Sequence, residues 1–287
     1  MARVWLALVG TALAWAATFH VAKFSVQFLP PAGAAVWRFV IATLFMVPVV
    51  GARETWDRAA LRRNLPVLLF LGAIGISGFQ LAMFYGLRTS SAINASLILS
   101  LNPAITVVLA AALDSQRLGA RQWFGLLLSL AGVVAVSVHG HWGALRELRI
   151  GRGEFIMLCG ALAWGVYSVA LRRNVRGLSV LQVSASTIAI CALSLLLGVA
   201  ILDPAQLGWP PLAAWPALLF MGVVGSGLAY LWWNAGVVKL GAGRAAMIGN
   251  LTPVFTVLMG VVMGQQLEAA QLAGAVMVVA GVILATA

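Results

Sequence analysis

The sequence predicts an all-α integral membrane protein with ten transmembrane helices in two inverted five-helix repeats around a central cavity. Composition is the first observation that predicts this fold: 62% of the 287 residues are hydrophobic and only 9% are charged. A soluble domain carries roughly 25% charged residues. The second observation is that motifs of the first half recur about 150 positions later. The net charge of +11 fits loop charges that orient helices, so no nucleic acid partner is expected.

Ten apolar segments approach the length of about 20 residues that a helix needs to cross a lipid bilayer. The predicted helices are Val4–Val21, Gly33–Val50, Leu65–Leu87, Ala92–Leu113, Trp123–Val138, Glu154–Leu171, Val180–Leu202, Leu212–Val238, Ala245–Met263 and Ala269–Thr286. The connections between them are short, so no soluble domain is expected beside them.

Two proline-containing heptapeptides anchor the repeat. Residues 101–107 share Leu, Pro, Thr and Val with residues 251–257, at a shift of 150. A proline inside a helix removes a hydrogen-bond donor and costs about 3 kcal/mol. A helix that lines a protein-walled cavity tolerates this loss better than a helix that faces lipid. Pro103 and Pro253 are therefore predicted to be structural helix breaks at equivalent places.

The repeat divides the chain into residues 1–140, residues 153–287 and a connecting loop, residues 141–152. Each repeat would contain five helices. Because five is odd, the second repeat enters the membrane from the opposite side, so the two repeats are inverted. Inverted repeats with a substrate site near the membrane midplane are a recurring plan of secondary transporters.

Basic residues in the short connections predict the orientation. If the N-terminus is cytoplasmic, twelve of the 18 Lys and Arg residues lie on the cytoplasmic side, as the positive-inside rule requires. An even number of helices then places both termini in the cytoplasm. The expected location is the cell inner (plasma) membrane, as a multi-pass protein in the bilayer. The oligomeric state stays open, and a monomer is plausible.

These features together resemble the EamA family of the drug/metabolite transporter superfamily. The motifs that carry the resemblance span nearly the whole chain: Trp15, Trp164, Arg38, Tyr85-Gly86-Leu87, Thr89-Ser90-Ser91-Ala92, Pro103, Pro253, Gly125, Ala131-Gly132, Gly274 and Ala280-Gly281. The resemblance implies ten helices, two inverted repeats and export of small metabolites. By its size and its aromatic-rich helices, the chain most resembles members that export aromatic amino acids.

Aromatic and polar residues at equivalent places predict a binding cavity, because a site for a small amphipathic solute needs apolar walls and a few polar groups. Trp15 and Thr18 lie three positions apart in the first helix, and Trp164 and Tyr167 hold the equivalent positions in the sixth. Residues three apart share a helix face, so we expect these four to bind the solute. The alternative is an aromatic belt at the membrane interface.

Other polar and aromatic residues inside the predicted spans extend this candidate set. They are Gln80, Phe84, Asn102, Tyr230, Trp233 and Asn250. An amide inside a span must be paired or face water, so helix-to-helix hydrogen bonding is the alternative for the three amides. Arg38 has two open interpretations as well: it snorkels to lipid headgroups, or it attracts an anionic group on the solute.

The acidic residues are informative by their positions. All seven fall in predicted loops or at helix ends: Glu54, Asp57, Asp114, Glu147, Glu154, Asp203 and Glu268. Proton-driven transporters usually place Asp or Glu in the membrane interior. The sequence therefore favours downhill export or exchange without a proton-carrying carboxylate at the midplane.

The sequence thus predicts a transporter that exports small metabolites by alternating access, most directly aromatic or other neutral amino acids. An exporter of drugs or other amphipathic metabolites is the alternative within the same class. An intramembrane enzyme is the alternative from another class, and the chain lacks its H-E-x-x-H and G-x-S-x-G motifs. No catalytic residue, metal or cofactor is expected.

Overall fold

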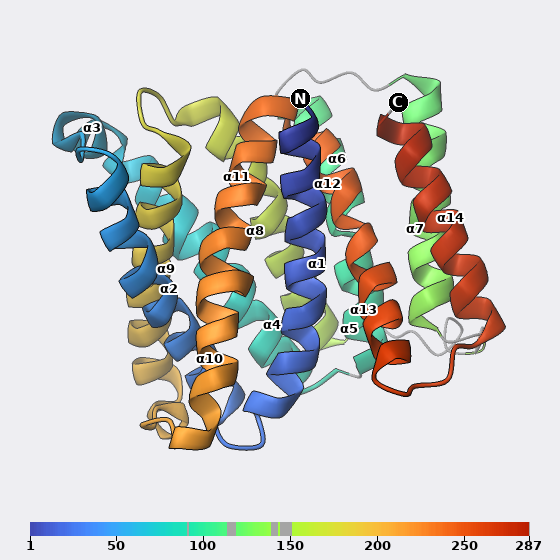
Figure 1. The fold of residues 1–287 in the computed structure, drawn as a ribbon, viewed down its shortest axis with the longest axis horizontal. Coiled ribbons are helices and arrows are strands. Elements are labelled where there is room, and N and C mark those ends of the chain that lie inside the picture. The colour runs from blue at the N-terminus through green and yellow to red at the C-terminus, as the bar shows by residue number, and fades with distance from the viewer. Residues whose placement is uncertain (91, 114–118, 139–142, 144–150, 287) are drawn as a thin grey trace.

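The computed structural model describes residues 1–90, 92–113, 119–138, 143 and 151–286. Within these residues the chain is helical and contains no β-strand. The helices stand side by side, and both termini lie at the same end of the bundle (Figure 1). Most of the predicted connecting loop, together with Asp114 and Glu147, lies outside the described residues.

The first half of the chain forms five helical spans. Its elements are α1 (Ala2–Ser25), α2 (Pro31–Arg53), α3 (Arg58–Leu69), the π-helix η1 (Phe70–Gly78), α4 (Phe79–Leu87), α5 (Ala92–Ser100), α6 (Asn102–Leu113) and α7 (Ala120–Ser137). The α3, η1 and α4 elements are continuous and make one span. The fourth span is interrupted at Leu101, which separates α5 from α6.

The second half repeats this order. Its elements are α8 (Arg152–Asn174), α9 (Val180–Leu202), the short 3₁₀ turns η3 (Pro204–Gln206) and η4 (Leu212–Ala214), α10 (Trp215–Gly222), the π-helix η5 (Val223–Leu228), α11 (Ala229–Leu240), α12 (Ala242–Gly249), α13 (Leu251–Val262) and α14 (Ala269–Thr286). Here the break falls at Asn250, between α12 and α13.

Membrane-length helices confirm the predicted fold class. Nine segments of the described chain are long and apolar enough to cross a bilayer, and a shorter apolar helix covers Leu97–Leu113. Together with the start of α5, this shorter helix makes the tenth span. The largest boundary error is at α3, which begins at Arg58 and not at Leu65. Asp57 caps this helix by accepting a hydrogen bond from the Ala60 amide at 2.8 Å, so the helix extends beyond the apolar segment.

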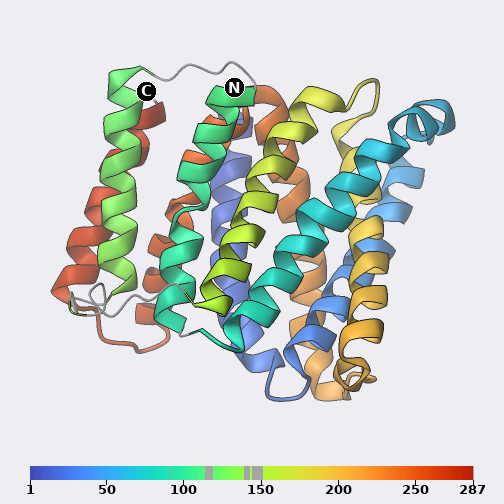
Figure 2. The ribbon, with the colours of Figure 1, turned by 180° about the vertical axis from the view of Figure 1, so that it is seen from behind.

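The two halves run in opposite directions. The α1 helix leads away from the end that holds the termini, whereas its counterpart α8 leads toward that end (Figures 1 and 2). Packing crosses between the halves, since α1 contacts α11 and α13 while α8 contacts α4 and α6. The halves are therefore intertwined, and the surface between them runs through the middle of the bundle.

Close helix contacts repeat with the same symmetry. A Cβ on Gly86 of α4 would collide with the side chain of Met157 on α8. A Cβ on Gly236 of α11 would collide in the same way with Leu8 on α1. Gly236 follows Gly86 by 150 positions, and Met157 follows Leu8 by 149. Each half thus makes the equivalent contact with the other half.

The last helices of the halves, α7 and α14, pack as an antiparallel pair beside the rest of the bundle (Figure 1). A Cβ on Gly125 would lie 2.5 Å from the carbonyl oxygen of Gly281, and a Cβ on Gly274 would lie 2.7 Å from that of Gly132. These distances exclude any side chain, so the glycines allow the two backbones to touch.

Candidate functional site

A cluster of five aromatic side chains occupies the middle of the bundle; we call it the central aromatic cluster. Its members are Trp15 of α1, Trp164 and Tyr167 of α8, and Tyr230 and Trp233 of α11. Trp164 contacts the other four rings, with centroid distances of 5.3–5.7 Å. Three helices from both halves thus contribute to one apolar surface, and it includes all five aromatic residues predicted for the first, sixth and eighth spans.

Two phenylalanines extend the cluster into neighbouring helices. Phe79 of α4 lies 5.6 Å from Trp164, and Phe39 of α2 lies 5.9 Å from Tyr230. Sequence reasoning missed both, because each lies among many apolar residues and nothing in the sequence shows which of these face the centre of the bundle. Edge-to-face and offset pairs of this kind contribute about 0.5–1.5 kcal/mol each beyond the burial of apolar area.

Tyr167 brings a polar group to one edge of the cluster. Its ring stacks on Trp164, and its hydroxyl donates a hydrogen bond to Asn234 Oδ1 on α11 at 2.7 Å. The Asn234 amide in turn donates to Ser184 Oγ on α9 at 2.9 Å. All three polar side chains are fully buried. This chain of hydrogen bonds connects α8, α11 and α9, and Asn234 and Ser184 were not among the predicted site residues.

Thr18 and Tyr167, predicted as equivalent residues, contact equivalent glycines in the two π-helices. A Cβ on Gly225 of η5 would collide with Thr18, and one on Gly75 of η1 would lie 2.7 Å from Tyr167 Cβ. Thr18 is buried, and its hydroxyl donates to the Ala14 carbonyl at 2.8 Å within its own helix. Its visible role is therefore to pack α1 against η5. Short π-helices are frequent at functional sites, and the sequence motif that marks these two is Phe-x-Gly-x-x-Gly at residues 70–75 and 220–225.

Gln80 and Phe84 lie one turn apart on α4, and both are partly exposed. Gln80 precedes Tyr230 by 150 positions, so it holds the equivalent position in the first repeat. Because Tyr230 lies in the central aromatic cluster, we infer that Gln80 also faces the centre of the bundle. The Gln80 amide has no hydrogen-bond partner in the described chain, and it is not among the buried unpartnered groups. It is thus open to a partner from outside the chain.

Asn102 directly precedes Pro103, and Asn250 lies three positions before Pro253; the two side chains make different contacts. Asn102 opens α6 directly after the break, and its Oδ1 is buried without a hydrogen-bond partner in the described chain. Asn250, at the equivalent break of the second half, donates to Ser129 Oγ of α7 at 2.7 Å and is 2% exposed. The Asn250 side chain therefore makes a hydrogen bond between helices, which was the alternative to solute binding at this residue. Asn102 Oδ1 remains an unused hydrogen-bond acceptor.

The described carboxylates stay near helix ends. Glu54 lies just after α2 and accepts hydrogen bonds from Ser179 and Gln182. Glu154, in the first turn of α8, accepts from Ser90 and Asn94. The remaining described acids are Asp57, Asp203 and Glu268, all at connections. No described carboxylate therefore contributes to the central aromatic cluster.

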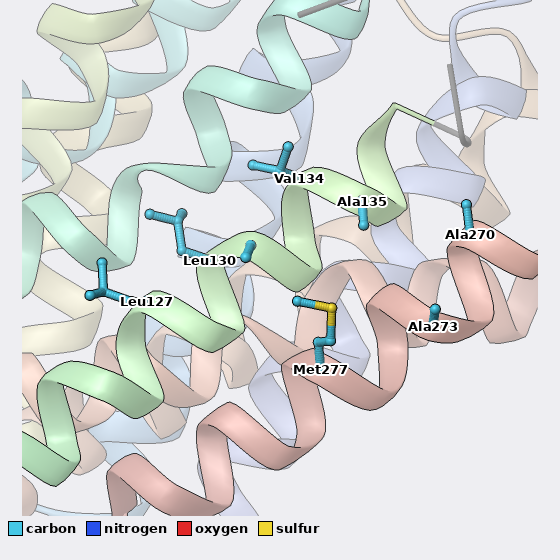
Figure 3. Close-up of a pocket in the computed structure, with 8 residues that line it drawn as sticks. Leu127, Leu130, Val134, Ala135, Ala270, Ala273 and Met277 are labelled. Atoms are coloured by element: carbon cyan, nitrogen blue, oxygen red, sulfur yellow. The ribbon is translucent and has the colours of Figure 1, made fainter. Parts of the chain in front are cut away.

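An apolar groove lies away from the central aromatic cluster. Figure 3 shows it between α7 and α14. Its volume is about 450 Å³. The residues that line it are Leu127, Leu130, Ala131, Val134, Ala135, Ala270, Ala273 and Met277. A specific solute site combines apolar walls with a few placed polar groups. This groove offers no polar side chain, so it is a poor match for the solute.

Comparisons with known proteins agree with this architecture. The profile of the EamA-like transporter family matches residues 3–138 and 151–287. A crystal structure of a protein with 26% sequence identity superposes with a TM-score of 0.84, covering 99% of this chain and 97% of that chain.

Three named relatives are similar along nearly their whole length. The chain is 33% identical over 284 residues to the uncharacterized transporter YyaM of Bacillus subtilis (strain 168), covering 99% of this chain and 93% of the relative. It is 28% identical over 290 residues to the aromatic amino acid exporter YddG of Ancylobacter novellus, covering 100% of this chain and 98% of the relative. It is 26% identical over 285 residues to a protein of Streptantibioticus cattleyicolor named "Probable terminal-alkyne amino-acid exporter", covering 98% of this chain and 92% of the relative. With two tandem matches to one family profile and these full-length relatives, the chain belongs to the EamA-like transporter family.

Proposed function

We propose that this transporter exports small amphipathic solutes, most directly aromatic or other neutral amino acids, through a site at the central aromatic cluster. The observation that carries the proposal is the meeting of Trp15 and Trp164 from opposite halves, 5.5 Å apart, with Tyr230 and Trp233 beside them. A surface shared by both halves changes when the halves move against each other. The names of two relatives, each an amino acid exporter, support the same solute class.

In this proposal the site combines the two kinds of group that an amino acid needs. The rings supply apolar area for a side chain. Gln80 and Asn102 supply an accessible amide and an unused acceptor oxygen, and an ammonium group prefers such oxygen atoms. In this proposal Trp15, Thr18, Gln80, Phe84, Asn102, Trp164, Tyr167, Tyr230, Trp233 and Asn250 form or support the site.

Alternating access follows from the inverted repeats. In this mechanism the repeats, residues 1–140 and residues 153–287, rock about a fixed central site. The breaks beside Pro103 and Pro253 allow α5–α6 and α12–α13 to bend at equivalent places. Since no described carboxylate lies in the centre, the proposal includes downhill export or exchange without a proton carrier at the midplane.

The proposed location is the bacterial inner membrane, with both termini in the cytoplasm. At the end of the bundle that holds the termini, α2 ends at Arg53, α3 begins at Arg58, and α8 has Arg172 and Arg173 in its last turn (Figure 1). Basic connections remain on the cytoplasmic side of a membrane. The bilayer and the solute are the partners that this proposal requires.

Uptake into liposomes by the purified protein tests the proposal. We would offer labelled Trp, Phe, Leu, Thr, Lys and Glu, and one lipophilic cation. Uptake of Trp, Phe and Leu above that of empty liposomes is the expected result. Uptake of the cation alone would replace the amino acid proposal with a drug exporter. No uptake of any solute, with or without an imposed ion gradient, would contradict the transport proposal.

A further inference from the structure

We propose that Arg38 binds the carboxylate of the transported solute and thereby selects solutes that carry one. This inference rests on the function proposed above and deepens it, since it assigns the anion-binding residue. Arg38 is the eighth residue of α2. At 1.5 Å per residue it lies about 10 Å inside the helix start, within the membrane-spanning segment.

The position of Arg38 around α2 directs it inward. Ala34 and Ala42, one turn before and after it, are buried at 5% and 0% exposure. The lipid-facing side of the helix carries Leu44 and Val47, which are 69% and 38% exposed. Arg38 lies nearly opposite that side, yet it remains partly exposed. Its accessible surface therefore belongs to the interior of the bundle and not to the lipid or headgroup region.

The charge of Arg38 is not neutralised by the described chain. Two of its N–H groups donate hydrogen bonds to η5: Nε to Ser226 Oγ at 2.5 Å and Nη2 to the Gly225 carbonyl oxygen at 3.1 Å. It forms no ion pair with a described carboxylate. A guanidinium has five N–H donors, so three remain for another acceptor. An unpaired charge inside a membrane is costly, which favours an anionic ligand there.

Helix packing alone does not require an arginine here. The equivalent position in the second half, 149 residues later, is Thr187. Gly222 packs against Ile41 and the Arg38 carbonyl, and Gly72 packs against Ile190 and the Thr187 carbonyl. The buried Thr187 hydroxyl bonds within its own helix. The equivalent helix contact in the other half therefore forms with a threonine at this position. Arg38 is not needed for the contact, and it is a difference between the two halves.

Arg38 adjoins the central aromatic cluster. Its guanidinium carbon lies 5.2 Å from the centroid of the Phe39 ring, and that ring lies 5.9 Å from Tyr230. A solute with a carboxylate at Arg38 can therefore place an apolar group toward the rings. Arginine also matches a carboxylate geometrically, because its parallel N–H groups donate to both oxygens.

The test compares binding of L-phenylalanine with binding of L-phenylalaninamide, which lacks the carboxylate. Binding would be measured as stabilisation of the purified protein against thermal unfolding over a concentration series. In the wild type we expect the amino acid to bind about tenfold or more tightly than the amide. In Arg38→Gln this ratio should fall to about one, while Arg38→Lys should keep part of it.

Two control variants separate binding from packing. Ser226→Ala removes one of the two hydrogen bonds of Arg38 to η5 and leaves the bond to the Gly225 carbonyl and the guanidinium itself, so the preference for the carboxylate should persist. Lys23→Gln removes an exposed charge at the same end of the bundle and should leave the ratio unchanged. Loss of the ratio in Ser226→Ala as fully as in Arg38→Gln would overturn the inference in favour of a packing role.

The remaining outcomes distinguish this inference from the proposed function. Equal binding of phenylalanine and its amide by the wild type would overturn the carboxylate site while transport of neutral solutes stands. An Arg38→Gln variant that folds and keeps the wild-type ratio would overturn it also. If neither compound binds and no amino acid is taken up into liposomes, the amino acid proposal fails, and the inference fails with it.

Discussion

Trp15 and Trp164 lie 149 positions apart in the chain, at equivalent places in the two halves, and meet edge to face with their ring planes at 74°. The contact therefore lies between the two halves, which the proposed alternating access would move against each other. In the proposed function this ring pair supplies part of the apolar surface that binds the solute. The first prediction concerns this pair.

Trp164→Leu is expected to lower phenylalanine uptake into liposomes about tenfold or more. Trp164 contacts four other rings, and each aromatic pair contributes about 0.5–1.5 kcal/mol. The matched control is Trp209→Leu, which changes a tryptophan that is 77% exposed in the connection between α9 and α10. Equal loss of uptake in both variants would argue against a solute site at the cluster.

The buried bond between Tyr167 and Asn234 should support the fold. Tyr167→Phe leaves Asn234 Oδ1 without its donor in a fully buried place. We expect the free energy of unfolding to fall by about 1–3 kcal/mol. Thermal unfolding in detergent, with Tyr167→Phe, Asn234→Ala and the double variant, measures the coupling. Strict additivity of the two single changes would show that the bond contributes nothing.

Gly125→Ala is expected to loosen α7 from α14. The new methyl group would lie 2.5 Å from the Gly281 carbonyl oxygen and 2.6 Å from the Ala285 nitrogen, so backbone must move, at a cost of about 1–3 kcal/mol. Gly51→Ala in the last turn of α2 is the control, because nothing lies within 4 Å of its Cβ position. Melting temperatures should fall for the first variant and stay or rise for the second. Equal melting temperatures would contradict the close contact.

Orientation is tested with single cysteines in a background where Cys159 and Cys191 are changed to alanine. Gly119 directly precedes α7, which begins at the end of the bundle that holds the termini, and Gly208 lies in the connection between α9 and α10 at the other end (Figure 1). In intact cells, a membrane-impermeant maleimide should label Gly208→Cys and spare Gly119→Cys until the membrane is opened. The reverse pattern would place the termini outside.

The fold could be predicted because it depends on patterns that survive in the sequence. Apolar length set the spans, and the shift between Pro103 and Pro253 set the repeat. The start of α3 was wrong because the Asp57 cap acts within a charged segment, where hydropathy carries no signal. The π-helices were also missed, since the Phe-x-Gly-x-x-Gly motif shared by the two segments is also compatible with an ordinary α-helix.

The candidate site was only partly predictable for a related reason. Trp15 and Trp164 stood out because they are equivalent and rare. Phe39 and Phe79 did not stand out, because the sequence of an apolar helix does not show which of its apolar residues face lipid and which face the centre of the bundle. Asn102 and Asn250 are both amides at the start of a proline-containing helix, yet Asn250 donates a hydrogen bond to Ser129 of α7 and Asn102 Oδ1 has no partner in the described chain. That difference depends on a contact between helices far apart in the chain.

Counterflow without any ion gradient tests the central claim most directly. Liposomes that contain the purified protein and a high concentration of unlabelled phenylalanine would be diluted into labelled phenylalanine at equal pH and salt on both sides. Alternating access by a central site without a proton carrier predicts transient accumulation of label above its outside concentration, and Trp164→Leu should diminish it. Accumulation that occurs only with an imposed proton gradient would contradict the account.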